Sequence, residues 1–360
     1  MVVSVELDAR EVEWRFARDR TIRAFAYNGV VPGPLIETEV GDTVEARLTN
    51  SLPQATTIHW HGVRVPAHMD GTEAVQPPVE PGGAFEYRFV VPDAGTFWYH
   101  SHTNETEQLE RGLYGGLIVR DPGEPDFDSE RVLILDDLKL DAEGEIAPFG
   151  DEHEHHAGRE GEVRLLNGAL EPELEIEVLL TPGERFDLAV GPFEEGERLE
   201  IEALPYDRGK GESERERFAT LRVGAAVASC AEVPATLRPI DPLVEPDVEP
   251  TRTISLKALM HEGHDQRADP VRVGELQVWE LVNETGQDHP FHIHGFFFQV
   301  VQENGRTPPE VAWKDTVNVP RKSQTTIAWL PDDRPGEWMY HCHILEHHAM
   351  GMMAHFSVVP

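Results

Sequence analysis

Residues 44–50 read Val-Glu-Ala-Arg-Leu-Thr-Asn, and the motif His-Trp-His-Gly begins at His59, nine residues after Asn50. The same combination returns near the other end of the chain, where residues 278–283 read Val-Trp-Glu-Leu-Val-Asn and His-Ile-His-Gly begins nine residues after the asparagine. Because a fixed internal period is the signature of repeated domains, this stretch indicates that the chain is built from copies of one unit.

A second pair of histidines closes each outer copy. Residues 99–102 read Tyr-His-Ser-His and residues 340–343 read Tyr-His-Cys-His, each with a glycine five residues before its first histidine. A third copy lies almost midway between the other two, where residues 163–167 read Val-Arg-Leu-Leu-Asn, and it has neither histidine pair. The middle copy is therefore predicted to be abbreviated.

The segments between these motifs predict strands. Short stretches rich in Val, Ile, Phe and Thr are broken by Pro-Gly pairs, and the 28 prolines and 30 glycines argue against long helices. We expect an all-β fold of three consecutive β-sandwich domains, with boundaries where acidic residues and prolines crowd. The expected domains are residues 1–122, 123–235 and 236–360, and the strands expected in the middle one are residues 131–135, 162–166, 185–190, 198–203 and 218–223.

The composition describes a folded and strongly acidic protein. Asp and Glu number 66 against 31 Lys and Arg, a net charge of -35, and such a field repels phosphate backbones and anionic lipid heads. Nucleic acid and membrane are therefore excluded as partners, and no apolar run approaches the about 18 residues of a membrane span.

The first residues include Glu6, Asp8 and Glu11 in place of an apolar signal core. We expect a soluble periplasmic or extracellular protein whose export signal has been removed, with a cytoplasmic location left open.

The four His-x-His pairs predict a metal cluster. Side chains on a strand alternate between faces, so the two histidines of each pair point the same way. Two sandwich domains that meet face to face would bring eight imidazoles together, enough for a small cluster and too many for one ion. The eight are His59, His61, His100, His102, His292, His294, His341 and His343.

Cys342 predicts a second metal site. It lies between two cluster histidines, so alternation directs its sulfur to the opposite face of the strand. His289 lies three residues before a cluster histidine, His347 follows Cys342 by five residues, and Met352 follows it by ten. Two imidazoles, a thiolate and a weak thioether are the ligand set of a blue copper electron-transfer centre.

With these motifs the chain resembles the multicopper oxidases, and within them the bacterial laccase-like enzymes with three cupredoxin domains. The resemblance covers nearly the whole chain and implies three consecutive cupredoxin-like Greek-key β-sandwich domains, the middle one shortened and without copper ligands. It also implies four copper ions per chain. The implied type 1 ligands are His289, Cys342, His347 and Met352, the type 2 ligands are His59 and His292, and the binuclear type 3 ligands are His61, His100, His102, His294, His341 and His343.

The resemblance implies a laccase-like reaction, in which phenols, aromatic amines or similar donors give single electrons and O₂ is reduced to water. Donors are expected to reach the type 1 site through an exposed imidazole edge of His289 or His347. Electrons would then pass through Cys342 to its neighbours His341 and His343, and Asp70 is the implied proton relay. In bacterial relatives a second acidic residue often follows the last type 1 histidine, but His348 stands there in this chain.

Other functions remain open. A metal-ion oxidase in copper homeostasis and a copper-binding electron-transfer protein are the alternatives, although electron transfer alone would leave the eight cluster histidines without a purpose. A copper nitrite reductase is disfavoured because its catalytic copper is mononuclear. The sequence assigns no role to Cys230, and His153, His155 and His156 are expected to lie on a solvated acidic loop.

The division of ligands between the first and third domains predicts the state of assembly. A middle domain that keeps enough strands to span the gap lets both halves of the cluster come from one chain. We therefore expect a monomer, with a trimer as the alternative, because shorter two-domain relatives complete the cluster between subunits.

Overall fold

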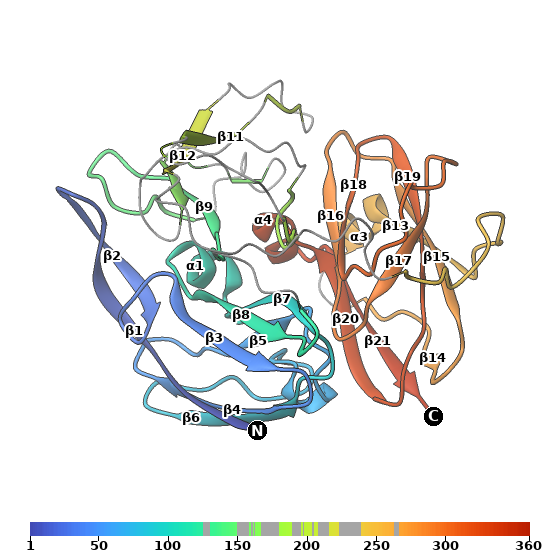
Figure 1. Ribbon diagram of the computed structural model, residues 1–360, viewed down its shortest axis with the longest axis horizontal. Coiled ribbons are helices and arrows are strands. Elements are labelled where there is room, and N and C mark those ends of the chain that lie inside the picture. The colour runs from blue at the N-terminus through green and yellow to red at the C-terminus, as the bar shows by residue number, and fades with distance from the viewer. Residues whose placement is uncertain are drawn as a thin grey trace.

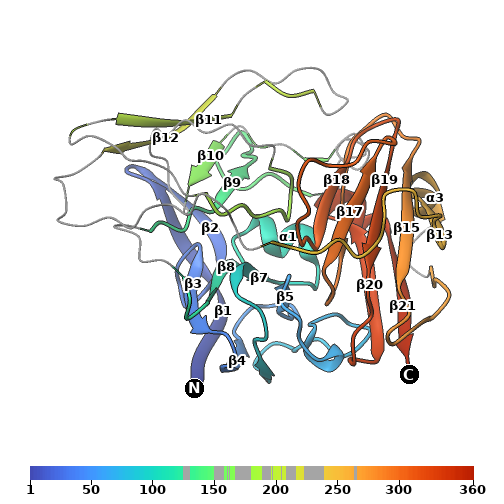
Figure 2. The same cartoon turned by 45° about the vertical axis from the view of Figure 1, so that its right-hand side comes forward.

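The computed structural model places two β-sandwiches side by side, with a third β-region above them (Figure 1). The first sandwich and the last face each other along the blue-green and red sides of the molecule, and both views agree on this arrangement (Figure 2). The structure describes residues 1–124, 130–149, 158–159, 161, 163–166, 180–188, 196, 198–203, 205–207, 216–222, 239–262 and 266–360.

The first sandwich has two four-stranded sheets. One has the order β2-β1-β4-β6, and the other has the order β3-β8-β7-β5. Between them lies an apolar core that includes the fully buried Trp60, Tyr87 and Tyr99. The strands are β1 (Val2–Ala17), β2 (Arg20–Tyr27), β3 (Gly33–Glu39), β4 (Thr43–Asn50), β5 (His59–His61), β6 (Ala84–Val90), β7 (Gly95–His100) and β8 (Tyr114–Arg120).

The last sandwich repeats this plan with one more strand. Its sheets have the orders β13-β15-β19-β17 and β14-β21-β20-β16-β18. Trp279, Trp329 and Trp338 fill its core and are no more than 1% exposed. The strands are β13 (Arg252–Ser255), β14 (Val271–Arg272), β15 (Gln277–Asn283), β16 (His289–Ile293), β17 (Phe298–Glu303), β18 (Thr316–Val319), β19 (Ser323–Trp329), β20 (Gly336–Cys342) and β21 (Met353–Val359).

The repeated asparagine has the same structural role in both outer domains. Asn50 ends β4, where its side-chain NH₂ donates to the carbonyl oxygens of Gln54 (2.9 Å) and Val79 (2.7 Å). Asn283 ends β15 and donates to the carbonyl oxygens of Gln287 (2.7 Å) and Val319 (2.9 Å). Each asparagine thus fixes the loop that leads into the strand with the first histidine pair.

The middle of the chain forms two two-stranded sheets within the described residues. They pair β10 (Val163–Leu166) with β9 (Leu135–Leu138), and β11 (Arg198–Ala203) with β12 (Glu216–Arg222). The strands expected at residues 162–166, 198–203 and 218–223 are therefore confirmed where they are described. The strand expected at 131–135 begins only at Leu135, and the described residues of the strand expected at 185–190, which are 185–188, form no strand.

Only short helices interrupt the strands in the described residues, namely η1 (Ala67–Met69), α1 (Glu105–Glu110), α3 (Leu256–Glu262) and α4 (Leu345–Ala349). None of the described helices is long and apolar enough to cross a membrane. Helices α1 and α4 lie together between the outer domains, where the Thr106 hydroxyl donates to the Leu345 carbonyl oxygen over 3.4 Å (Figure 1). The all-β cupredoxin-like fold is confirmed, and the three domain boundaries stay a prediction.

Candidate copper centre

Two pairs of antiparallel strands place the four His-x-His motifs. In the first domain β5 pairs with β7, so that His59 lies opposite His100. In the last domain β16 pairs with β20 in the same way, with His292 opposite His341. The two strand pairs approach each other across the domain interface, and all eight imidazoles lie there with no more than 8% of any residue exposed.

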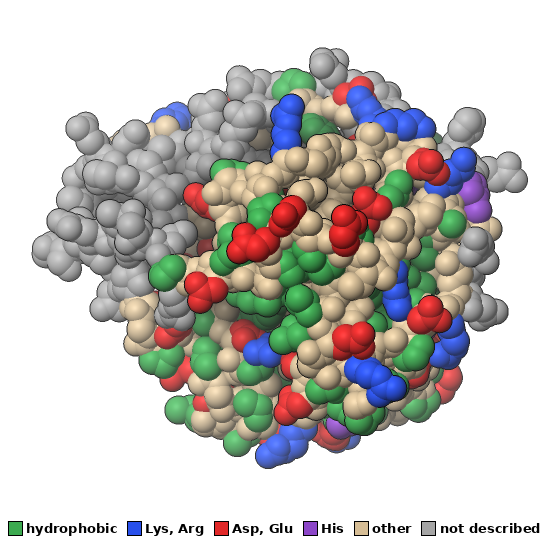
Figure 3. Space-filling model, turned by 90° about the vertical axis from the view of Figure 1, so that its right-hand side faces the viewer, with side chains coloured by type: hydrophobic (Ala, Val, Ile, Leu, Met, Phe, Trp, Pro, Cys, Tyr) green, Lys and Arg blue, Asp and Glu red, His purple; other side chains and the backbone are tan. Residues whose placement is uncertain are grey.

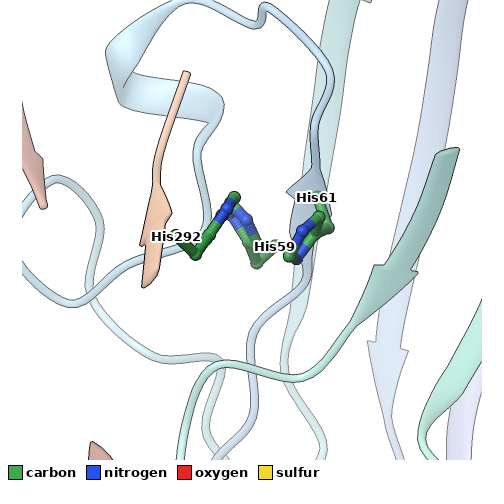
Figure 4. Close-up of side chains that lie close together, drawn as sticks. All are labelled: His59, His61 and His292. Carbon is green, nitrogen blue, oxygen red and sulfur yellow. The ribbon is translucent and has the colours of Figure 1, made fainter. Parts of the chain in front are cut away.

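The eight histidines divide into groups whose nitrogens lie within 4.8 Å of one another. Two of these groups share no residue, and each takes ligands from both outer domains; they are His61, His100 and His343, and His102, His294 and His341. The two histidines left over, His59 and His292, group with His61, and Figure 4 shows these three side chains turned toward one another. The groups overlap, because His61 belongs to two of them, so the assignment of these histidines to type 2 and type 3 ions stays a prediction.

Several of the cluster histidines present a nitrogen without a hydrogen-bond partner, which fits a metal ligand. The Nδ1 atoms of His59, His100 and His292 lie 2.8–2.9 Å from backbone carbonyl oxygens, which can only accept, so Nδ1 carries the proton. Their Nε2 atoms are buried and have no hydrogen-bond partner. Buried polar atoms are otherwise almost always satisfied, so these lone pairs aim at a place for a cation.

Burial favours the neutral form, which metal ligation requires, in several of the cluster histidines. It lowers the pKa of His102 to about 4 and that of His343 to about 3. It also holds the pKa of His100 and of His294 well below the ordinary value. The site therefore presents lone pairs at neutral pH, where an exposed histidine would be partly protonated.

The second site lies on the other side of β20. Cys342 Sγ lies 3.6 Å from His289 Nδ1 and 3.5 Å from His347 Nδ1, and the two nitrogens are 3.2 Å apart. Met352 is fully buried. Two backbone hydrogen bonds hold it next to these residues: its N–H donates to the His347 carbonyl oxygen (2.9 Å), and its own carbonyl oxygen accepts from the Cys342 N–H (3.0 Å). Burial raises the pKa of the Cys342 thiol to about 12, so a metal that binds here must displace its proton.

The expectation of an exposed imidazole edge at this site is wrong. His289 and His347 are both 0% exposed. The outer nitrogen of His289, Nε2, lies 2.8 Å from the Thr285 hydroxyl, and that hydroxyl also donates to the Asn283 side-chain oxygen (2.7 Å). The loop between β15 and β16 thus covers the imidazole that the sequence places at the surface.

Comparison with known proteins agrees with this geometry. Family models described as multicopper oxidase match residues 8–124 and 248–360. The chain belongs to the multicopper oxidase family. The multicopper oxidase MmcO of Mycobacterium tuberculosis is 28% identical over 94% of this chain and 84% of its own. The crystal structure of a multi-copper oxidase from Pseudomonas thermotolerans has a TM-score of 0.83 at 29% identity and covers 100% of both chains. A multicopper oxidase from Campylobacter jejuni described as a metallo-oxidase has a TM-score of 0.80 at 25% identity, over 99% of this chain and 91% of that chain.

Family membership makes this oxidase a copper-binding oxidoreductase that uses O₂ and an electron donor. The identity of each copper ligand and the number of ions remain predictions for this chain.

Asp70 lies where a carboxylate can hold cluster histidines of this oxidase in place. Its Oδ2 lies 2.8 Å from Nδ1 of His294, and its carbonyl oxygen accepts from Nδ1 of His59 (2.9 Å). It is 1% exposed and follows η1, and the next residue, Gly71, has a φ of +86° and no space for a Cβ because Ile58 O would be 1.9 Å away. The backbone at this point is therefore fixed against β5.

Glu105 is a site residue that the sequence reasoning missed. This first residue of α1 is 5% exposed, its Oε2 lies 2.5 Å from His348 Nδ1, and its Oε1 lies 3.4 Å from His100 Nδ1. Helix α1 therefore brings a carboxylate next to His348, which stands where bacterial relatives often have an acidic residue. The only signal in the sequence is its position three residues after His102, which is weak without the fold.

Asp315 was also missed. It precedes β18, is 2% exposed, and lies 3.2 Å from His61 Nε2 through its Oδ1. Its carbonyl oxygen accepts from His292 Nδ1 over 2.9 Å. No motif marks it, because its partners come from distant parts of the chain.

Several residues noted in the sequence lie outside the described residues, namely His153, His155, His156, Asn167 and Cys230.

Proposed function

We propose that this chain is a laccase-like oxidase that couples one-electron oxidation of phenols, aromatic amines or similar donors to four-electron reduction of O₂ to water. The supporting observation is the position of Cys342. Its sulfur lies beside His289 and His347, while its two peptide neighbours belong to the two different three-histidine groups. Bound copper would supply the one-electron chemistry and the site for O₂.

The chain's own contribution is placement. The proposed type 1 ligands are His289, Cys342, His347 and Met352, the proposed type 2 ligands are His59 and His292, and the other six cluster histidines are the proposed type 3 ligands. Three consecutive residues, 341–343, give a covalent connection between the thiol site and the cluster. Asp70 is the proposed proton carrier, since it is the carboxylate in contact with both His59 and His294.

A second candidate is a metal-ion oxidase, and the burial of the type 1 site supports it. A bulky phenol cannot touch His289 or His347 directly when both are 0% exposed, whereas a small ion needs less space at the surface above them. The Campylobacter jejuni relative described as a metallo-oxidase makes this class relevant to a chain of the same family.

Oxygen uptake by the copper-loaded protein tests these proposals. The panel would contain a substituted phenol, an aromatic amine, and cuprous and ferrous ions, and copper per chain would be measured on the same sample. Laccase-like function predicts a higher kcat/KM for the organic donors, and metal-ion oxidase function predicts the reverse. Fewer than about four copper ions per active chain would contradict the proposed ligand set.

A location of this protein outside the cytoplasm stays a prediction.

A further inference from the structure

Residues 181–188, which we call the cluster strap, come from the part of the chain that the sequence treats as a spacer. Yet they touch the cluster. Gly183 has a φ of +86°, and a Cβ there would lie 3.0 Å from His343 Cδ2 and 3.1 Å from His61 Cε1. The backbone of the strap therefore packs against two imidazoles of one three-histidine group, at a distance that only glycine permits without displacing them.

The cluster strap is anchored to both outer domains. On the first domain, the Thr96 hydroxyl donates to Asp187 Oδ1 (2.5 Å) and the Thr96 carbonyl oxygen accepts from Arg185 Nε (3.0 Å). On the last domain, Lys314 Nζ lies 2.9 Å from Glu184 Oε1. The strap thus connects β7 to the segment before β18, and these are the elements on either side of the cluster.

At the centre of the strap, Arg185 makes a two-pronged ion pair with Asp315. Nη1 and Nη2 of Arg185 donate to Oδ1 and Oδ2 of Asp315, both over 2.6 Å. Asp315 is 2% exposed, and the arginine side chain is 20% exposed. This fork geometry fixes the plane of the carboxylate as well as its charge. The same carboxylate lies beside His61, and the backbone of Asp315 holds His292.

Arg185 places its positive charge directly against this buried carboxylate. Gly62 leaves the space for the pair, because a Cβ there would lie 2.5 Å from Asp315 Oδ2 and 2.6 Å from Arg185 Nη2. The glycine of the first His-x-His-Gly motif is therefore required by a residue from the middle of the chain.

We propose that Arg185 is a positioning residue of the copper cluster, which orients His61 and His292 through Asp315, so that the middle domain completes the cluster. This inference rests on the proposed copper ligands. His292 is one of only two histidines proposed for the type 2 ion, whereas each type 3 ion has three. Loss of the Arg185 fork should therefore weaken type 2 copper binding first. Loss of an outer partner of a metal ligand typically weakens metal binding by about 10–100-fold.

The test compares Arg185→Gln and Arg185→Lys with a matched control, Arg64→Gln. Arg64 also makes a two-pronged ion pair, to Asp93 (2.6 and 2.7 Å), and also joins the outer domains through Asp332 (3.1 Å). Its carboxylate partners contact no proposed copper ligand in the part of the chain that the structure describes. The measurements are copper per chain, the blue colour of the type 1 site, the electron paramagnetic resonance signal of type 2 copper, and unfolding temperature without copper.

The Arg185→Gln protein is expected to keep its blue colour and to lose the type 2 signal and about one copper per chain, after dialysis that leaves the wild type fully loaded. The Arg185→Lys protein should retain an intermediate amount, and Arg64→Gln should lower only the unfolding temperature. Equal type 2 copper in all proteins, or equal loss in Arg64→Gln, would overturn the inference alone. A wild-type chain without type 2 copper would overturn the proposed function as well.

Discussion

At the scale of single residues, Cys342 divides the two sites. Its sulfur faces His289 and His347, and the residues on either side of it face the cluster. Cys342→Ser should abolish the blue colour while the protein still binds about three copper ions, because the cluster ligands do not depend on the sulfur. Visible spectra and copper analysis of the loaded protein check this. A serine variant that stays blue would refute the type 1 assignment.

Asp70 gives a second prediction at this scale. Asp70→Asn keeps an oxygen that can accept from His294 but removes the carboxylate that a proton relay needs. Reoxidation of the reduced enzyme by O₂ should slow by about 10²-fold or more, while reduction of the type 1 site by a donor stays unchanged, since Asp70 lies on the cluster side. Stopped-flow measurement of the two half-reactions decides the matter. An equal loss in both would show that Asp70 is structural only.

At the scale of elements, β9 joins the middle of the chain to the first domain through the partly buried carboxyl group of Asp136. Burial raises the pKa of Asp136 from 3.8 to about 7, although it accepts a hydrogen bond from the Tyr114 hydroxyl (2.5 Å). The folded chain therefore keeps a proton there that the unfolded chain releases. The contribution of Asp136 to stability is full below about pH 4 and is lost as the pH rises to about 7.

Asp136→Asn should therefore stabilise the protein relative to wild type by an amount that grows from pH 4 to about pH 7 and then stays constant. The maximum is about 4 kcal/mol, the free-energy equivalent of the pKa shift. Urea unfolding of copper-free wild type and variant at several pH values measures the difference directly, and the shared titration of the histidines cancels. A difference that does not change with pH would contradict the raised pKa of Asp136.

At the scale of the whole molecule, the net charge of -35 should make the enzyme favour positively charged electron donors. Acidic side chains are spread over the face of the last domain, with basic ones between them (Figure 3). Cationic aromatic donors should have a higher kcat/KM than anionic donors of the same size at low salt, and the preference should fade as the screening length falls to about 8 Å at physiological ionic strength. Steady-state kinetics across a salt series test this. A preference for anionic donors at low salt would contradict it.

The same scale gives the prediction of a monomer. Both halves of the cluster come from one chain, because His59 and His292 lie in the same group although they belong to different domains. Light scattering of the copper-loaded protein should give a mass near 40.4 kDa at concentrations where it is active. A mass near three times that value, with activity lost on dissociation, would indicate a trimer.

Sequence patterns alone were enough to predict the family, the repeated strands and the histidines that come together. These features follow from local rules: alternation along a strand places His59 and His61 on one face, and the repeat places the equivalent residues of the last domain opposite them. His289, in contrast, is fully buried and hydrogen-bonded to Thr285, whereas the sequence alone predicted an exposed edge there. Whether a loop covers a side chain cannot be predicted from a periodic sequence pattern.

The residues around the cluster, in contrast, come together through contacts between domains. Glu105, Arg185 and Asp315 carry no motif. Glu105 and Asp315 contact the histidines, and Arg185 contacts Asp315, because a short helix, the cluster strap and a loop before β18 converge on one interface. Contacts between residues about 130 positions apart, such as Arg185 and Asp315, arise from the docking of whole domains. For that reason the sequence gives the ligands of a metal site more readily than the residues that hold those ligands in place.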